Sequence, residues 1–282
     1  MSNFVKKYPT ISLFILAQIL SGGIAGLVLA GVLPSGIIFL ATFGTSVAGI
    51  ILTAIADGKD GVWKLLGRLL TWRVGIGWWA VAALHMGVIT LVGLYLYNLF
   101  GGPSPDLSSP GPLSGAIIAL LMFTFTAGLG EELGWRGFLL PRLQSRYTAL
   151  VASLIVAVPW TLWHWMLFAI EMPGLPYYSL TVAFGFVPAM LGFLVYLMAW
   201  STLHTWVYNN TRGSLLMMCL MHGSEAWVGY FLFAGAFDQD FGDLGNLAGL
   251  VVVMVVTAII VVLISGAQNL SRSNERIMLQ DA

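Results

Sequence analysis

A series of long apolar stretches is the feature that most constrains what this chain can fold into. About eight of them, each roughly twenty residues long, can cross the hydrocarbon core of a bilayer as α-helices. Only 9% of the residues are charged, whereas soluble domains carry about 25%. The runs also lack the roughly ten-residue alternation of a membrane β-barrel. The sequence therefore predicts an all-α, polytopic membrane helix bundle that forms a single domain over residues 1–282.

The order of the charged residues predicts how this bundle is oriented. The expected spans lie at approximately 11–33, 36–56, 75–100, 114–140, 149–170, 179–201, 214–235 and 245–266. With the N-terminus inside, all 12 basic residues fall on inside segments. The outside loops carry acidic residues instead: Asp106, Glu171, Asp238, Asp240 and Asp243. Because cytoplasmic loops are enriched in Lys and Arg, we expect both ends of the chain to be cytoplasmic.

The segment between the second and third spans has its own pattern, GKDGVWKLLGRLLTWRVG, at residues 58–75. Asp60, Lys64 and Arg68 recur every four residues, and the other side is apolar. This pattern is typical of an amphipathic helix that lies in the membrane interface. A solvated connector is the alternative interpretation.

Ionisable residues reappear inside the fourth span, in GLGEELGWRGFLL at residues 128–140. Charge inside a span is costly and marks a candidate functional site. Glu132 and Arg136 are four residues apart with the acid first, which favours a helical ion pair. Successive helical residues point about 100° apart, so we expect Glu131 to face a different side, without a local partner. These residues predict a working carboxylate at Glu131 and a structural pair at Glu132 and Arg136; a helix-end ion cluster is the plainer alternative.

Four histidines also lie in or near the spans. His164 is in the fifth span, and His222 is in the seventh, with Glu225 three residues later on nearly the same helix face. His85 and His204 have no polar company nearby in sequence, so we expect both to be structural. A packing role is also open for His164 and His222. If the helices bring Glu131, His164 and His222 together, however, they form a general-base or metal-ligand set suited to hydrolysis.

Three motifs in this part of the chain resemble the CAAX-protease and bacteriocin-processing family of intramembrane endopeptidases, also called the Abi family. EELGWR at 131–136 matches its Glu-Glu-x-x-x-Arg motif, and WTLWH at 160–164 matches its aromatic-x-x-x-His motif. YNNTRGSLLMMCLMH at 208–222 is similar to the approach to its last His. The resemblance covers about 115–230, which we expect to be the catalytic core.

The resemblance implies a peptidase that hydrolyses a peptide bond in a membrane-associated, prenylated or leader-type substrate. Glu131 would activate water with help from His164, and His222 would steady the oxyanion. The family implies either a metalloprotease or a glutamate-type protease; Zn²⁺ could be held by Glu131, His164 and His222. One position departs, because Ala226 stands where the family has Asn. Asn209, Asn210 or Ser224 could substitute as donor, or Glu225 could give the site another character.

Two other functions are open on the sequence alone. The chain could be a non-catalytic binding or immunity protein on the same scaffold, which Ala226 favours. It could also be a haem or ion-translocating protein that uses its four histidines, although that reading leaves the Glu-Glu-x-x-x-Arg spacing unexplained. A net charge of zero gives no nucleic-acid footprint. The expected partners are membrane lipid and a peptide substrate, and the expected location is a bacterial cell membrane.

Overall fold

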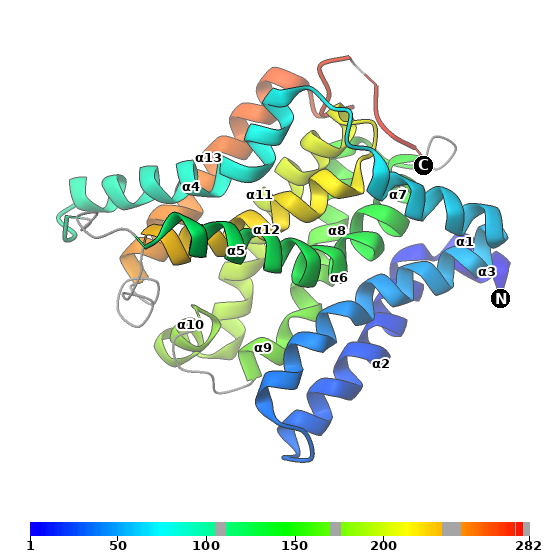
Figure 1. Cartoon of the computed structure of the whole chain (residues 1–282), viewed down its shortest axis with the longest axis horizontal. Helices are drawn as coiled ribbons and strands as arrows, with labels where there is room; N and C mark the ends of the chain where they lie inside the picture. Colours follow the sequence, from blue (N-terminus) through cyan, green and yellow to red (C-terminus); the bar gives the residue numbers. More distant parts are fainter. Residues whose placement is uncertain (105–110, 170–175, 233–243, 274, 279–282) are drawn as a thin grey trace.

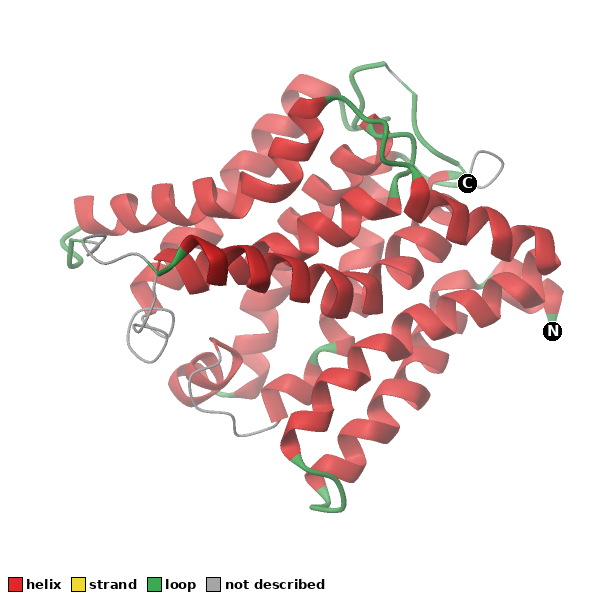
Figure 2. Cartoon of the chain, viewed as in Figure 1, coloured by secondary structure: helices red, strands yellow, loops and turns green. Residues whose placement is uncertain are grey.

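The computed structural model describes residues 1–104, 111–169, 176–232, 244–273 and 275–278. Within these ranges the regular structure is all helical and contains no strand (Figure 2). The elements are α1 (Ser2–Lys7), α2 (Pro9–Leu29), η1 (Ser35–Thr42), α3 (Phe43–Gly67), η2 (Arg68–Leu70), α4 (Ile76–Leu99), α5 (Leu113–Phe123), η3 (Thr124–Gly128), α6 (Leu129–Glu132), η4 (Leu133–Leu139), α7 (Leu140–Gln144), α8 (Ala149–Trp163), α9 (Trp165–Ala169), α10 (Pro176–Phe184), α11 (Phe186–Asn210), α12 (Leu215–Leu232) and α13 (Leu244–Ser265).

Seven helical runs in the described part of the chain are long and apolar enough to cross a membrane. They are Pro9–Leu29, Gly36–Leu70, Ile76–Leu99, Leu113–Gln144, Ala149–Ala169, Phe186–Asn210 and Leu247–Ser265. The remaining predicted span, 214–235, corresponds to α12, whose side chains are described only in part. The predicted fold class, a polytopic all-α membrane bundle, is therefore confirmed, with about eight spans as an approximate count.

Helices α5, α6, α11 and α12 lie in the middle of the bundle (Figure 1). The hairpin of α2 and α3 packs on one side, where α3 meets η4. On the other side α4 packs against both α12 and α13. Between them α12 contacts α5 and η3, and α11 contacts α8. The helix with the two glutamates is thus enclosed by helices from both ends of the chain.

The sixth predicted span is displaced in the structure. The sequence predicted 179–201, but the helix breaks at Gly185, whose φ of 82° lies in the left-handed region that favours glycine. Residues Pro176–Phe184 form the separate helix α10, and the span runs from Phe186 to Asn210. His204, expected near the end of the span, therefore lies inside a continuous helix and is fully buried.

The segment at 58–75 is only partly the interfacial helix that the sequence predicted. Gly58, with φ 73°, interrupts α3, and the helix resumes after it. Trp63 is exposed while Leu65 is buried, which fits an apolar face shared between lipid and protein. The expectation that Arg68 lies on a charged outer face is wrong, because it is buried. Its guanidinium donates hydrogen bonds to the Tyr208 hydroxyl and to the Gly137 carbonyl oxygen, at 2.7 Å for the latter.

Both ends of the described chain contact the same end of the bundle. Arg146, just after α7, donates hydrogen bonds to the carbonyl oxygens of Lys6 and Lys7. Arg276 donates from Nε to the Gln144 carbonyl oxygen at 2.9 Å. Basic residues from distant segments therefore gather at one end, as their inside placement requires. That this end is cytoplasmic stays a prediction, and the acidic loop residues Asp106, Glu171, Asp238, Asp240 and Asp243 lie outside the described residues.

Candidate active site

The glutamate motif lies on an irregular stretch of helix in which π-helical turns flank a short α-helical segment. The π turns are η3 and η4, and α6 lies between them. Helix α3 packs directly on this stretch: a Cβ built on Gly49 would lie 2.8 Å from the Gly134 Cα atom. Ser46 donates to the Leu129 carbonyl oxygen at 2.7 Å and accepts from the Leu133 amide at 3.2 Å. Inserted π turns are frequent at functional sites, and here α3 satisfies the backbone on both sides of the glutamates.

The predicted pair of Glu132 and Arg136 is formed. Arg136 Nη1 lies 3.0 Å from Glu132 Oε1 and 3.2 Å from Oε2, and both side chains are fully buried. Arg136 Nε and Nη2 are buried and have no hydrogen-bond partner among the described residues. The ion pair therefore neutralises Glu132 but leaves part of the guanidinium's bonding capacity unused.

Glu131 has partners that the sequence argument did not anticipate. Its Oε2 accepts hydrogen bonds from the indole Nε1 of Trp160 at 2.7 Å and of Trp135 at 3.3 Å. Trp135 is one turn away, so the expectation that Glu131 lacks a local partner is wrong. Since both indoles bind Oε2, Oε1 is the oxygen that accepts no hydrogen bond from a described residue.

His222 joins the two glutamates. Its Nδ1 lies 2.9 Å from Glu132 Oε1, and its Nε2 lies 3.8 Å from Glu131 Oε1, which is beyond hydrogen-bond distance. The expectation that the two glutamates face different sides is thus also wrong. Their side chains are long enough to converge on one imidazole that comes from α12, 90 residues further along the chain.

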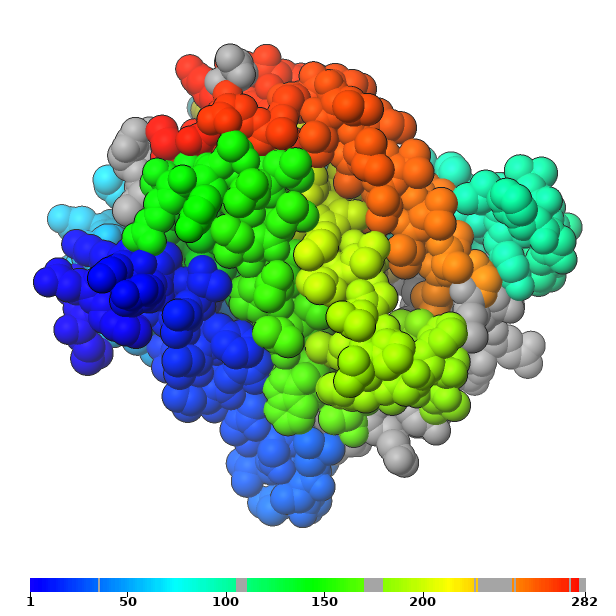
Figure 3. All heavy atoms as spheres, turned by 180° about the vertical axis from the view of Figure 1, so that it is seen from behind, coloured from blue at the N-terminus to red at the C-terminus, as the bar shows by residue number. Residues whose placement is uncertain are grey.

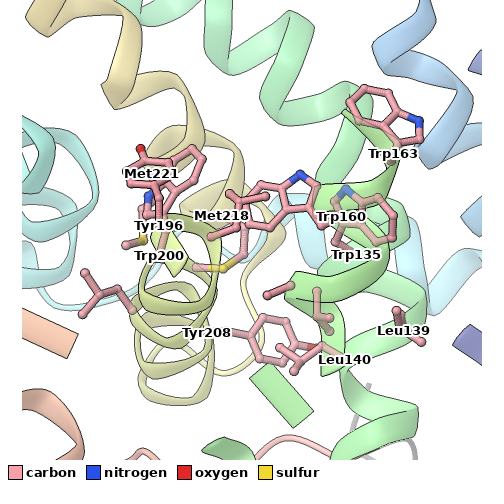
Figure 4. Close-up of a cluster of buried hydrophobic side chains, with 14 of the residues drawn as sticks. Trp135, Leu139, Leu140, Trp160, Trp163, Tyr196, Trp200, Tyr208, Met218 and Met221 are labelled. Atoms are coloured by element: carbon pink, nitrogen blue, oxygen red, sulfur yellow. The ribbon is translucent and has the colours of Figure 1, made fainter. Parts of the chain in front are cut away.

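The Trp160 ring contacts several residues of the site, and Figure 4 shows it beside Trp135 in the buried interior. The Arg136 Cζ atom lies 4.1 Å from the centroid of this ring. The rings of His164 and His222 lie 6.2 and 5.9 Å from it. Trp160 therefore contacts Arg136 of the ion pair and both predicted histidines.

His164 adjoins the site through its contact with the Trp160 ring. Its Nδ1 lies 2.8 Å from the Trp160 carbonyl oxygen. Because a carbonyl oxygen can only accept, Nδ1 carries the proton, and Nε2 of the neutral ring is an acceptor. The ring packs edge-on against Phe193 and Trp163. His164 is 6% exposed, His222 5% and Glu131 2%, so the site is nearly enclosed.

His204 is a site residue that sequence reasoning placed among the structural ones. Its ring lies 6.4 Å from that of His222 and 4.9 Å from that of Trp200, which stacks on Trp160 at 5.2 Å. Its Nε2 is buried without a partner among the described residues. A signal was present: WSTLH at 200–204 repeats the Trp-x-x-x-His spacing of WTLWH at 160–164.

His85 lies at the edge of the same aromatic group. Trp200 donates from Nε1 to His85 Nε2 at 3.4 Å, and Ser224 Oγ lies 3.3 Å from His85 Nδ1. No hydrogen bond or ion pair links His85 to the glutamates in the described part of the chain. These contacts place His85 beside Trp200 and Ser224, and its structural role stays a prediction.

Ala226 stands at the position of the family's Asn, and its side chain lies outside the described part of the structure. The substitutes suggested by sequence do not lie beside His222. Asn209 pairs with Gln144, and Asn210 donates to the carbonyl oxygens of Trp206 and Leu270. Ser224 donates to the Met221 carbonyl oxygen and meets His85. The structure therefore offers no direct replacement for the Asn among these three residues.

The donor set for a metal was tested against the same geometry. Within the described ranges, no three His, Cys, Asp or Glu side chains are grouped closely enough to share one metal ion. Glu131 and His222 are neighbours, whereas the ring of His164 packs against Trp160, Trp163 and Phe193. The predicted set of Glu131, His164 and His222 does not fit a zinc site in this arrangement, in which four ligands surround the ion at about 2 Å.

Fold and site together define an integral membrane protein whose helices enclose a Glu-Glu-Arg-His cluster. Residues 113–228 match the family model described as type II CAAX prenyl endopeptidase Rce1-like. The resemblance predicted from the three motifs is confirmed over this segment. A CAAX prenyl protease 2 of Methanococcus maripaludis is 27% identical over 145 residues, which are 50% of this chain and 52% of that protein. The chain thus spans about half the length of this curated relative.

Proposed function

We propose that this chain is an intramembrane endopeptidase in which Glu131 activates water. The observation that carries the proposal is the convergence of Glu131, Glu132 and His222 from two helices on one buried point. Burying several ionisable groups inside a span is costly and is typical of a functional site. The family match and the name of the relative support the reaction class.

In the proposed reaction, Glu131 Oε1 takes a proton from a water molecule. Oε2 is held by the two indoles, so Oε1 is the oxygen oriented for this transfer. The water oxygen attacks the scissile carbonyl carbon, and a tetrahedral oxyanion forms. Glu131 then returns the proton to the amide nitrogen as the C–N bond breaks, which leaves a carboxyl and an amino end.

The oxyanion needs donors, and the family's Asn is absent. In an imidazolium, Nε2–H of His222 can donate to the oxyanion while Nδ1–H stays on Glu132. We assign a second contribution to the unpartnered Nε and Nη2 of Arg136, which lies over the Trp160 ring. This assignment extends the predicted structural role of Arg136, and His164 would act as an acceptor that orients the water.

Three finer points belong to the proposal. The substrate is a membrane-associated peptide, of prenylated or leader type, and the protein works in a bacterial cell membrane with its basic end in the cytoplasm. The mechanism is of the glutamate type, which is supported by the lack, among the described residues, of a group of three or more His, Cys, Asp or Glu side chains that could hold a metal ion. Glu225 and Ala226 lie next to the site on α12, and a non-catalytic binding or immunity protein on this scaffold is the alternative that an inactive chain would favour.

The test uses the purified chain in liposomes with membrane-anchored reporter peptides, some prenylated and some of leader type. We expect the wild type to cut at least one class and Glu131→Gln to cut none, at equal amounts of folded protein. Elemental analysis of the active protein should find no stoichiometric zinc, and chelators should leave the rate unchanged. Cleavage that survives Glu131→Gln would overturn the assigned base, and a zinc-dependent rate would overturn the glutamate mechanism.

A further inference from the structure

A cavity lies beside the proposed active site, between α11 and α13. It has a volume of about 550 Å³ and is also lined by Met86 of α4 and Glu225 of α12. This size falls in the range of small-ligand sites. Seen from behind, the surface is hollowed between the yellow-green α11 and the orange α13 (Figure 3). Residues at its rim, such as Val195 and Val252, are exposed toward the side that faces lipid.

The lining of this cavity is apolar except at one place. Glu225 is the one acidic or basic side chain among the described residues that line it, and the Tyr196 hydroxyl donates a hydrogen bond to Glu225 Oε1 at 3.2 Å. A carboxylate has about four acceptor positions, and no other described residue donates to Glu225. A half-buried carboxylate in an apolar wall is costly without a partner, so a ligand that brings a positive charge to it would relieve that cost.

The surrounding charges favour a cation at this place. Glu131, Glu132 and Glu225 are three carboxylates near the site, whereas Arg136, the guanidinium beside them, is bound to Glu132. His222 also binds Glu132, through Nδ1 at 2.9 Å. Glu225 lies three residues after His222, nearly on the same face of α12. An anionic ligand would be repelled by Glu225, and a neutral one would bring no positive charge to it.

We propose that this cavity binds an amphiphilic amine: an apolar chain along α11 and α13 whose ammonium group pairs with Glu225. The chain would enter from the lipid side, and the ammonium would replace the missing donors around the carboxylate. The proposal goes beyond the peptidase activity and does not depend on it. Phe193 and Tyr196 line the cavity on one side, while Phe193 packs on His164 on the other. An occupied cavity would therefore fix the wall of the proposed active site.

The cavity offers a variant that fills it without disturbing its neighbours. Gly192 lines the cavity on α11, and a Cβ built there meets nothing within 4 Å. Gly192→Leu should therefore occupy the space while keeping the helix. Gly26 of α2 is also open to a Cβ and is remote from the cavity, so Gly26→Leu is the matched control. Glu225→Gln keeps the size of the side chain and an oxygen for Tyr196 but removes the charge.

The experiment uses the full chain in phosphatidylcholine nanodiscs with two photoreactive probes, a dodecylamine and a dodecanol. We expect the amine to label peptides of α11 or α13, with unlabelled dodecylamine competing at least about tenfold better than dodecanol. Glu225→Gln should weaken amine labelling about tenfold and leave dodecanol labelling unchanged. Gly192→Leu should reduce labelling by both probes, and Gly26→Leu by neither.

The contrary results are equally definite. Equal labelling by amine and alcohol, or amine labelling that Glu225→Gln does not change, would mean that the cavity does not select a cation. Labelling at α11 or α13 that Gly192→Leu leaves intact would place the probe outside the cavity. Either result overturns the proposal, whether or not the chain cleaves a reporter peptide.

Discussion

Two buried polar clusters of this molecule differ in how completely their hydrogen bonds are satisfied. Near the basic end, the side-chain amides of Gln144 and Asn209 donate to each other at 3.0 and 2.8 Å. Their remaining N–H groups bind the carbonyl oxygens of Ile277 and Asn269. In the glutamate cluster, by contrast, Arg136 Nε and Nη2 lack partners among the described residues.

The contrast separates a structural brace from a candidate site. A buried network whose donors and acceptors are all paired stabilises the fold and has nothing left to offer a ligand. A buried network with unused donors carries an energetic cost, which a substrate can relieve on binding. The two clusters therefore predict opposite responses to substitution: changes in the brace alter stability, and changes at Glu131 alter chemistry.

The largest stability effect is expected at the buried ion pair of Glu132 and Arg136 in the glutamate cluster. Glu132→Gln leaves the buried guanidinium of Arg136 without its carboxylate, and breaking such a buried pair costs about 3–5 kcal/mol. Thermal melts and yield after purification measure this loss. A stable Glu132→Gln protein that lacks activity would instead show that Glu132 takes part in the reaction and is not mainly structural.

A smaller effect, on the cleavage rate, should distinguish the two tryptophans of the WTLWH motif. Trp160→Phe removes the indole that donates to Glu131 at 2.7 Å and should slow reporter cleavage about tenfold with the fold retained. Trp163→Phe is the matched control, because Trp163 Nε1 has no partner among the described residues. Equal rates for the two variants would show that the indole does not orient the carboxylate.

The smallest effect is expected at the exposed rim of the basic end. Asp57 pairs with Arg142, and its side chain is 26% exposed, so solvent partly screens the pair. Arg142 is buried but keeps its hydrogen bond to the Phe138 carbonyl oxygen without Asp57. Asp57→Asn should lower stability by about 1 kcal/mol or less and leave the cleavage rate per folded molecule unchanged. A marked loss of the cleavage rate would show that the basic end affects the chemistry of the active site, which the comparison of the two clusters does not predict.

The sequence predicts those parts of the site that depend on local helix geometry. The spans follow from apolar length, and the pair of Glu132 and Arg136 follows from four-residue spacing. Arg68 was misplaced because its partners, Gly137 and Tyr208, are 69 and 140 residues away. The span that contains His204 was displaced because a single glycine breaks the preceding helix.

The convergence on His222 could not be read from spacing either. Glu131 and Glu132 diverge at their Cα atoms, and only the packing of α12 against α5 and η3 brings one imidazole within reach of both. His204 was missed because its contacts with the rings of Trp160 and Trp200 appear only in the folded structure. Sequence thus identifies residues on one helix face, while contacts between distant helices require the structure.

The most direct test of the central claim is the cleavage rate per folded molecule of two variants in the same liposomes. Glu131→Gln should lose cleavage by at least about 100-fold while melting near the wild type. Gln144→Leu leaves Asn209 partly unpaired and should lower the free energy of unfolding by about 1–3 kcal/mol. Its cleavage rate per folded molecule should stay normal. Wild-type cleavage by Glu131→Gln, or a rate lost in Gln144→Leu alone, would contradict the account.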